Sequence, residues 1–248
     1  MPDEPAPQGA FPATRWSAIV AARSADGAER RRGLERVAAA YWKPVYKLLR
    51  TRWNKSHEDA RELTQEFFAR VVEKDTLSGF DPAKGRLRTY VRTLVDAMVM
   101  NEARDARREK RGGGAEVLSL DFELAEGELL RTGIASPENP DAYFEREWVR
   151  SLFALALERL RAECAARGKT VHVRLFELYD VEDSEPRPTY ADLAARFDIA
   201  VTDVTNHLAY ARRELRRITL ETLREMTVSE EEFRSEARAL LGFTPDRD

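Results

Sequence analysis

Apolar residues recur at helical spacing along much of the chain, which favours helices over strands. The clearest early stretch spans residues 31–53, where the apolar stripe consists of Leu34, Val37, Ala38, Tyr41, Val45, Leu48 and Leu49. Pro44 lies inside this stretch and predicts a kink or break near Lys43, because proline lacks the backbone donor that a helix interior uses. A shorter helix capped by Thr14 is expected before it.

Residues 56–74 predict a second helix with two contrasting faces. Ser56 and Asp59 have the spacing of a capping box, which marks the start of this helix. Its apolar face carries Leu63, Phe67, Phe68, Val71 and Val72, and its opposite face carries Asp59, Glu62, Gln65, Glu66 and Glu73. Residues 79–85 then predict a turn, and a basic helix from about residue 86 to 111 ends at three consecutive glycines.

From residue 112 to about 140 the helical period is lost, and Gly, Pro, Ser and acidic residues are frequent. This composition is typical of a linker between two domains. Helical spacing resumes at about residues 143–167, and a further helical segment spans about 170–179. A proline-containing break follows at residues 184–188.

Residues 189–217 have the pattern of a helix-turn-helix. Thr189 and Asp192 form a capping box that starts a short helix over residues 190–197. A three-residue turn begins at Asp198, and a longer helix starts near Val201. Asp198 stands where glycine is usual, and aspartate is one of the few residues that tolerate the left-handed geometry of such a turn.

The longer helix of this motif has a buried and an open face when residues are placed 100° apart. The expected buried stripe consists of Val204, Leu208, Ala211, Leu215 and Ile218, and the opposite face carries Thr202, Asn206, Ala209, Arg213 and Arg217, flanked by Thr205 and Arg216. Asparagine and threonine can contact base edges, and arginines can contact phosphates. The alternative is a solvated face whose arginines form intrahelical ion pairs.

A second basic constellation lies in the helix expected at residues 86–111. It comprises Arg86, Arg88, Arg92, Arg104, Arg107, Arg108, Lys110 and Arg111, with four interleaved acidic residues. Tyr90 stands between the arginines, and Phe80 lies in the preceding turn. Cations with aromatic rings suit phosphates and unpaired bases. The alternative is a charged surface helix with Tyr90 in the core.

Composition agrees with an all-α protein, because charged residues make up 34% of the 248 and glycine accounts for only 12. Residues 1–111 carry 23 Lys and Arg against 16 Asp and Glu, whereas residues 112–147 carry 2 against 9. The N-terminal half is therefore basic and the linker acidic. The one cysteine, Cys164, predicts a small buried residue, and the sequence indicates no disulfide, metal site or cofactor.

Four segments combine these features in order: HEDARELTQEFFARV at residues 57–71, FDPAKGRLRTY at 80–90, KRGGG at 110–114 followed by LSLDF at 118–122, and the helix-turn-helix at 190–217. Together they resemble an RNA polymerase sigma factor of the extracytoplasmic-function (ECF) type, within the sigma-70 family. The resemblance spans roughly residues 30–225. It implies a factor that directs transcription initiation at specific promoters and is not an enzyme.

The resemblance implies two small helical domains joined by a flexible acidic linker. We expect a disordered leader at residues 1–13, sigma domain 2 at 14–111, the linker at 112–142, sigma domain 4 at 143–225 and a helical extension at 226–248. The acidic linker is similar to the family's linker that threads basic channels of the polymerase. We expect the extension to pack on the second domain, and a role in regulation is the alternative.

The resemblance also assigns site residues by motif position. The surface that binds core RNA polymerase would comprise Asp59, Glu62, Leu63, Gln65, Glu66 and Phe67. The first domain would open and contact the −10 element of promoter DNA with Arg86, Arg88, Tyr90, Arg92, Asn101, Arg104, Arg107 and Arg108. The second domain would read the −35 element in duplex form with Thr202, Thr205, Asn206, Arg213, Arg216 and Arg217.

Other function classes explain the sequence less well. A stand-alone helix-turn-helix regulator leaves the acidic face of residues 56–74 and the acidic linker without a role. A helical enzyme is disfavoured, because there is no Gly-rich phosphate loop and the three histidines have no metal-site spacing. With no signal peptide and no long apolar run, we expect a soluble cytoplasmic protein. The regulator stays open: an anti-sigma factor, a kinase or the extension.

Overall fold

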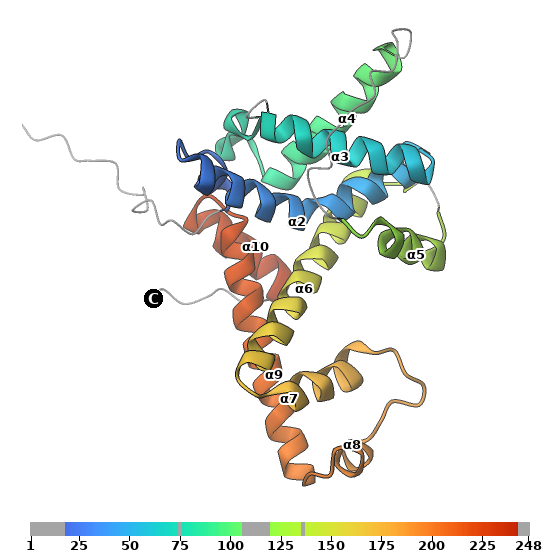
Figure 1. Cartoon of the computed structure of the whole chain (residues 1–248), viewed down its shortest axis with the longest axis vertical. Helices are drawn as coiled ribbons and strands as arrows, with labels where there is room; N and C mark the ends of the chain where they lie inside the picture. Colours follow the sequence, from blue (N-terminus) through green and yellow to red (C-terminus); the bar gives the residue numbers. More distant parts are fainter. Residues whose placement is uncertain (1–17, 74–75, 106–119, 135–136, 243–248) are drawn as a thin grey trace, which may run out of the picture. The chain divides into compact units, whose positions relative to one another are not determined.

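The computed structural model describes residues 18–73, 76–105, 120–134 and 137–242, which form helices and turns without a strand among them. The prediction of an all-α fold is confirmed. The described residues fall into two compact units (Figure 1). Unit 1 comes from Met1–Ser151 with Leu223–Asp248, and unit 2 from Leu152–Thr222. The predicted leader at residues 1–13 lies outside the described residues, as does the cap at Thr14.

Most of unit 1 packs on the long helix α2 (Gly27–Thr51). Helices α1 (Ala18–Ala22), α3 (His57–Glu73), α4 (Leu87–Asp105) and α5 (Phe122–Thr132) all contact it. Asp26 caps its first turn by accepting from two backbone amides. Gly33 lets α1 approach closely, since a Cβ there would lie 2.3 Å from the Ala22 nitrogen. The other helices of unit 1 thus pack around α2.

Of the kink or break predicted near Lys43, the break is wrong, because α2 continues through Pro44. Proline removes one backbone hydrogen bond from a helix interior. Here Val45, Leu48 and Leu49, which follow Pro44, are each 0% exposed. Burial of these side chains offsets the missing bond, so the helix stays continuous.

Residues 76–84 form two short 3-10 helices, η1 (Thr76–Gly79) and η2 (Pro82–Lys84), at the turn expected there. Arg23 donates to the Leu77 carbonyl from Nε at 3.0 Å and from Nη2 at 2.7 Å. Arg23 Nη2 also donates to the Phe80 carbonyl. These bonds tie the turn to the end of α1 and so fix where α4 (Leu87–Asp105) begins.

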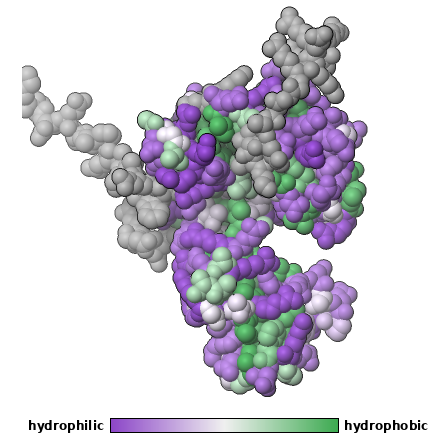
Figure 2. All heavy atoms as spheres, in the orientation of Figure 1, coloured by the Kyte–Doolittle hydropathy of each residue, from purple (hydrophilic) through white to green (hydrophobic). Residues whose placement is uncertain are grey.

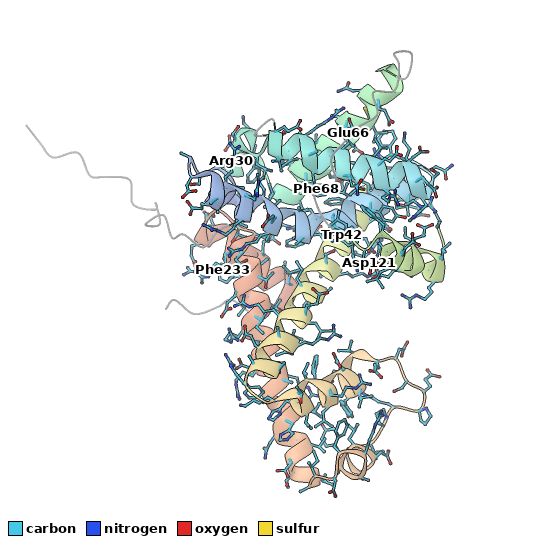
Figure 3. All side chains as sticks on the ribbon, in the orientation of Figure 1. Arg30, Trp42, Glu66, Phe68, Asp121 and Phe233 are labelled. Carbon is cyan, nitrogen blue, oxygen red and sulfur yellow. The ribbon has the colours of Figure 1, made fainter. Side chains whose placement is uncertain are left out.

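The predicted linker contains an unexpected helix, α5 (Phe122–Thr132). Phe122, Ala125 and Leu129 are buried, and the Phe122 ring lies edge-on to Trp42 of α2 with centroids 5.3 Å apart. Trp42 and Asp121, the residue that caps α5, are labelled where the two helices meet (Figure 3). This part of the linker is therefore packed on the first unit rather than extended.

Carboxylates of α5 pair with basic residues of α2. Glu126 Oε2 accepts from Arg50 Nε at 2.9 Å and from the Tyr46 hydroxyl at 2.6 Å. Glu128 accepts from Lys43 at 2.9 Å and from Lys47 at 2.7 Å. Hydrogen bonding from Arg50 lowers the pKa of Glu126 below its ordinary value.

Unit 1 is completed by the start of α6 (Pro140–Ala166) and by α10 (Glu230–Leu241). Phe144 and Trp148 of α6 pack on Tyr41 of α2, with ring centroids 6.5 and 6.2 Å away. On α10, Phe233, Glu236 and Ala237 are buried. The expectation that the C-terminal extension packs on the second domain is wrong, since α10 belongs to the first unit.

Unit 2 contains the rest of α6, α7 (Thr170–Phe176), a π-helical turn (Glu177–Val181), α8 (Tyr190–Phe197) and most of α9 (Val201–Glu225). Its core includes Leu160, Cys164, Leu175, Phe176, Leu193, Val204, Leu208 and Ile218. Cys164 is 1% exposed, which confirms the prediction of a buried cysteine. In unit 2, α8 and α9 are thus joined by a three-residue turn and share one core with α6 and α7.

The predicted capping box of α8 is present. Thr189 Oγ1 accepts from the Asp192 amide at 3.1 Å, and Asp192 Oδ2 accepts from the Thr189 amide at 2.8 Å. Asp198 follows α8 with a φ of 51°, so it adopts the expected left-handed conformation. Both predictions depend on local chemistry, which the sequence displays directly.

The face of the molecule shown in Figure 2 is mostly hydrophilic, and its hydrophobic residues gather in patches between hydrophilic ones. Leu124 and Leu130 of α5 are 48% and 65% exposed. No helix among the described residues is long and apolar enough to cross a membrane.

The contacts of Glu126 hold α5 against α2, and a substitution at Glu126 tests how much they contribute. Replacing Glu126 with Gln leaves Arg50 without its anionic partner, and the side chains of both are largely buried, at 14% and 13% exposure. We expect the amides of α5 to exchange hydrogen about 5–30-fold faster, roughly 1–2 kcal/mol of local stability. The measurement is hydrogen exchange by mass spectrometry, with Glu123→Gln as the control because the Glu123 side chain is 86% exposed.

The pH dependence of this stabilisation provides a second test of the role of Glu126. Because the folded pKa of Glu126 lies below the ordinary 4.5, the stabilisation is complete above that value and is lost as the pH falls through the lower folded value. The Glu126→Gln variant and the wild type should therefore converge at acidic pH. Equal exchange of α5 in the two proteins at neutral pH would contradict this account.

Candidate protein and nucleic-acid interfaces

The solvent-facing side of α3 carries the acidic residues predicted to bind a protein partner. Ser56 Oγ accepts from the Asp59 amide at 3.1 Å and caps the helix. Asp59, Glu62 and Glu66 are exposed, and Gln65 is half-buried. The arrangement gives a row of carboxylates on one helix face, spaced three to four residues apart.

Leu63 and Phe67 do not lie on that surface, which corrects their placement by the sequence. Each is 4% exposed and belongs to the core of unit 1. The Phe67 ring packs edge-on against Phe68, with centroids 5.0 Å apart. A helical motif mixes surface and core positions, and these two are its core positions. They hold α3 in place beneath the acidic row.

The start of α5 lies beside this face of α3. Arg61 and Gln65 line one open hollow together with residues 120–123. His57 Nε2 lies 3.2 Å from Glu123 Oε1, and His57 Nδ1 lies 2.8 Å from the Tyr46 hydroxyl. A partner that covers the N-terminal half of α3 would therefore also meet the segment before α5.

The first arginines of α4 are paired with carboxylates rather than displayed. Arg88 is 6% exposed, and its Nη2 donates to Glu145 Oε1 at 2.7 Å. Its guanidinium carbon lies 4.9 Å from the Trp148 ring centroid. Arg88 Nη1 lies 2.8 Å from Glu236 Oε1. Burial would lower the pKa of Arg88, but the two carboxylates outweigh burial and raise it.

The neighbouring arginines are also engaged. Arg86 Nε lies 2.9 Å from Glu236 Oε1, although its side chain is 42% exposed. Arg92 Nη1 donates to Asp96 Oδ2 at 2.6 Å, and Arg92 pairs with Asp141 as well. All three arginines predicted to meet DNA near the start of α4 therefore hold internal anionic partners in this structure.

The aromatic pair of this region has a structural role. Tyr90 is half-buried, donates its hydroxyl to the Thr76 carbonyl at 2.8 Å and packs on Phe80 with centroids 5.6 Å apart. Phe80 is 4% exposed. The pair holds the turn against α4, although Tyr90 is only half-buried and not in the core, where the alternative placed it.

Farther along α4 the predicted residues are open or undescribed. Asn101 is exposed. Arg104 lies within α4, although the structure does not describe its side chain. Arg107 and Arg108 lie outside the described residues, as does the glycine-rich break at residues 112–114.

The second helix of the helix-turn-helix, α9, presents the two faces expected of it. Val204, Leu208, Ala211 and Ile218 are each 0% exposed. Exposed positions on the other side are Thr202, Thr205, Asn206, Arg213 and Arg216. A helix with small polar residues at its open N-terminal end and arginines beyond can enter a DNA major groove.

Arg213 and Arg217 differ in environment although both were predicted to contact DNA. The Arg213 side chain is 69% exposed, and its nearest carboxylate, Glu214, is 4.0 Å away. Arg217 instead lies among Glu163, Glu214 and Glu221, with N–O distances of 2.5, 3.1 and 2.6 Å. Although burial opposes it, contact with these carboxylates raises the pKa of Arg217. Arg217 thus fits the alternative of an ion-paired helix face.

Sequence reasoning missed an anchor of α9 at Asp180, in the π-helical turn. Asp180 accepts from Arg212 Nε at 2.9 Å and from Arg212 Nη2 at 3.0 Å. Arg187 donates to the same carboxylate at 3.3 Å, and its guanidinium lies 4.0 Å from the Tyr179 ring centroid. Arg212 and Arg187 lie 32 and 7 residues from Asp180 in the sequence, so no helical period predicts these contacts. The anchor fixes α9 against the segment before α8.

Comparison with known families is consistent with this geometry. A family model described as "ECF sigma factor" matches residues 22–221, which include α2 through most of α9. No curated protein and no solved structure matches the chain.

Proposed function

The chain belongs to the ECF sigma factor family, and on this premise we propose how its two units divide the work. As a family member it is an RNA polymerase sigma factor that directs transcription initiation at promoters, and it binds core RNA polymerase and promoter DNA. Sigma factors are initiation factors rather than enzymes. A stand-alone regulator would leave the exposed acidic row of α3 without a role. Its site of action would be the cytoplasm, where polymerase meets DNA.

Unit 1 docks on core polymerase through the acidic row of α3. Asp59, Glu62 and Glu66 are exposed for this contact, and Gln65 borders it. Rows of like charge steer a partner of opposite charge and fix its register. The buried Leu63 and Phe67 contribute by keeping α3 rigid. The −10 strand is held by Arg86, which precedes α4, and by Arg88, Arg92, Asn101 and Arg104 of α4. Arg107 and Arg108, which lie outside the described residues, belong to the same proposed contact.

Unit 2 reads the −35 duplex with α9. The observation that carries this assignment is the exposed face of Thr202, Thr205, Asn206, Arg213 and Arg216. On the opposite side Val204, Leu208, Ala211 and Ile218 are buried, and Leu215 is half-buried. Asparagine can bond adenine through two atoms, and threonine can bond a base or contact a thymine methyl group. Arg213 is exposed enough to reach a phosphate. An anti-sigma factor or a kinase would act by covering or modifying one of these faces.

Charge reversal on α3 tests the polymerase contact. Glu62→Lys and Glu66→Lys are each expected to weaken binding of core polymerase by about tenfold, because each replaces attraction with repulsion at the interface. Affinity is measured with a fluorescently labelled protein and core enzyme, and helicity is checked by circular dichroism. Glu35→Lys is the matched control, since Glu35 is an exposed acidic residue on α2. Unchanged affinity in both α3 variants would refute the assignment of this surface.

Removal of one arginine tests the duplex contact. Arg213→Ala should weaken binding of mixed-sequence duplex DNA and reduce the slope of log affinity against log salt by about 1. Arg161→Ala is the control, because Arg161 is an exposed arginine of the same unit whose partner is Glu177. Arg217→Ala should instead lower the stability of unit 2 by about 0.5–1 kcal/mol, since Glu163, Glu214 and Glu221 lose a shared cation but keep Arg159 or Arg167 as a partner. An unaltered salt slope in Arg213→Ala would remove Arg213 from the interface.

A further inference from the structure

The C-terminal helix α10 places the carboxylate of Glu236 against two arginines, Arg86 and Arg88, at the start of α4. Glu236 is 1% exposed, and its Oε1 lies 2.8 Å from Arg88 Nη1 and 2.9 Å from Arg86 Nε. Glu145 of α6 approaches the same two guanidiniums, at 2.7 and 3.5 Å. Arg86 and Arg88 are thus neutralised by residues that are 57 or more positions away in the chain.

The contact between Glu236 and the arginines is close but poorly aligned. Among the described residues, neither carboxylate oxygen of Glu236 accepts a hydrogen bond of good geometry. Glu232, one turn earlier, is half-buried, and its partial burial together with the charge of Glu236 raises its pKa. A buried carboxylate that lacks aligned donors is costly to keep in place. Helix α10 is therefore held by an ion pair in which an anion with better-aligned hydrogen bonds to Arg86 and Arg88 can replace Glu236.

Besides this contact, α10 is held by its buried residues and by an ion pair between Glu230 and Arg224 at 3.2 Å. Its buried residues are Phe233, Glu236 and Ala237, and Phe233 lies under the Arg224 guanidinium, 4.2 Å from ring centroid to carbon. The label of Phe233 in Figure 3 marks the helix near the beginning of α2. A helix of 12 residues is marginal in water without tertiary contacts, so it can detach as one unit.

We propose that α10 is a built-in competitor of the −10 strand, in which Glu236 occupies the arginine pair that the strand needs. The proposal rests on the function proposed above, in which Arg86 and Arg88 contact that strand. Phosphates bind guanidinium groups through paired, well-aligned hydrogen bonds, which the Glu236 contact lacks. Single-stranded DNA and α10 then exclude each other, and the described structure is the closed form.

Binding of single-stranded DNA by the full chain tests the proposal. The probe is a fluorescein-labelled 12-nucleotide strand of mixed sequence, followed by anisotropy. Glu236→Gln keeps the shape of the side chain and removes its charge, so it should tighten binding by about three- to tenfold as the closed fraction falls. Glu231→Gln makes the same change of charge at an exposed position on the same helix and is the matched control.

The gain in affinity for single-stranded DNA must also depend on Arg86 and Arg88. In an Arg86→Ala, Arg88→Ala background the effect of Glu236→Gln should disappear, since nothing is left to release. Equal affinities for wild type, Glu231→Gln and Glu236→Gln would overturn the proposal. A gain of the same size in both single variants would also overturn it, because it would reflect net charge alone.

A second measurement uses the wild type and does not depend on how a variant folds. Hydrogen exchange of residues 230–241 is followed with and without an excess of the same strand. Loss of protection in α10 on binding supports the proposal, and retained protection in the DNA-bound protein overturns it. If the strand binds through Arg86 and Arg88 while α10 stays protected, only the competition fails. If the strand does not require these arginines, the −10 assignment itself fails.

Discussion

A guanidinium removed from water needs an anionic partner, and the arrangement of unit 1 follows from this constraint at Arg88. Its side chain is nearly enclosed by Trp148 and by the carboxylates of Glu145 and Glu236. These partners come from α6 and α10, which lie far along the chain. Pairing at one buried arginine therefore brings together three segments that no local signal in the sequence connects.

The same constraint explains the uneven distribution of charge. The basic N-terminal part and the acidic stretch that follows it match each other within one unit. Glu126 and Glu128 of α5 pair with Arg50, Lys43 and Lys47 of α2, and Glu147 pairs with Lys47 at 2.7 Å. The family resemblance had suggested that the acidic linker runs through basic channels of the polymerase. In this structure Glu126 and Glu128 of the linker instead pair with basic residues of α2, and binding in such channels would compete with these pairs.

Features fixed by local chemistry could be predicted from the sequence. Thr189 with Asp192, the left-handed Asp198 and the buried stripe of α9 each depend on neighbours within a few residues. Features that depend on distant pairing could not. Helix α5 is short, contains Gly127 and buries only three residues, so its period is too weak to see. Arg88 and Arg217 have the sequence context of DNA-binding residues, and only the fold shows which carboxylates reach them.

The central claim is that this chain gives core polymerase its choice of promoter, and run-off transcription tests it most directly. Core enzyme would be supplied with linear genomic fragments from the organism that encodes the protein, with and without the purified chain. The account predicts discrete run-off products that require the chain and share a two-element promoter upstream of their start sites. The absence of any chain-dependent product across the library would contradict it.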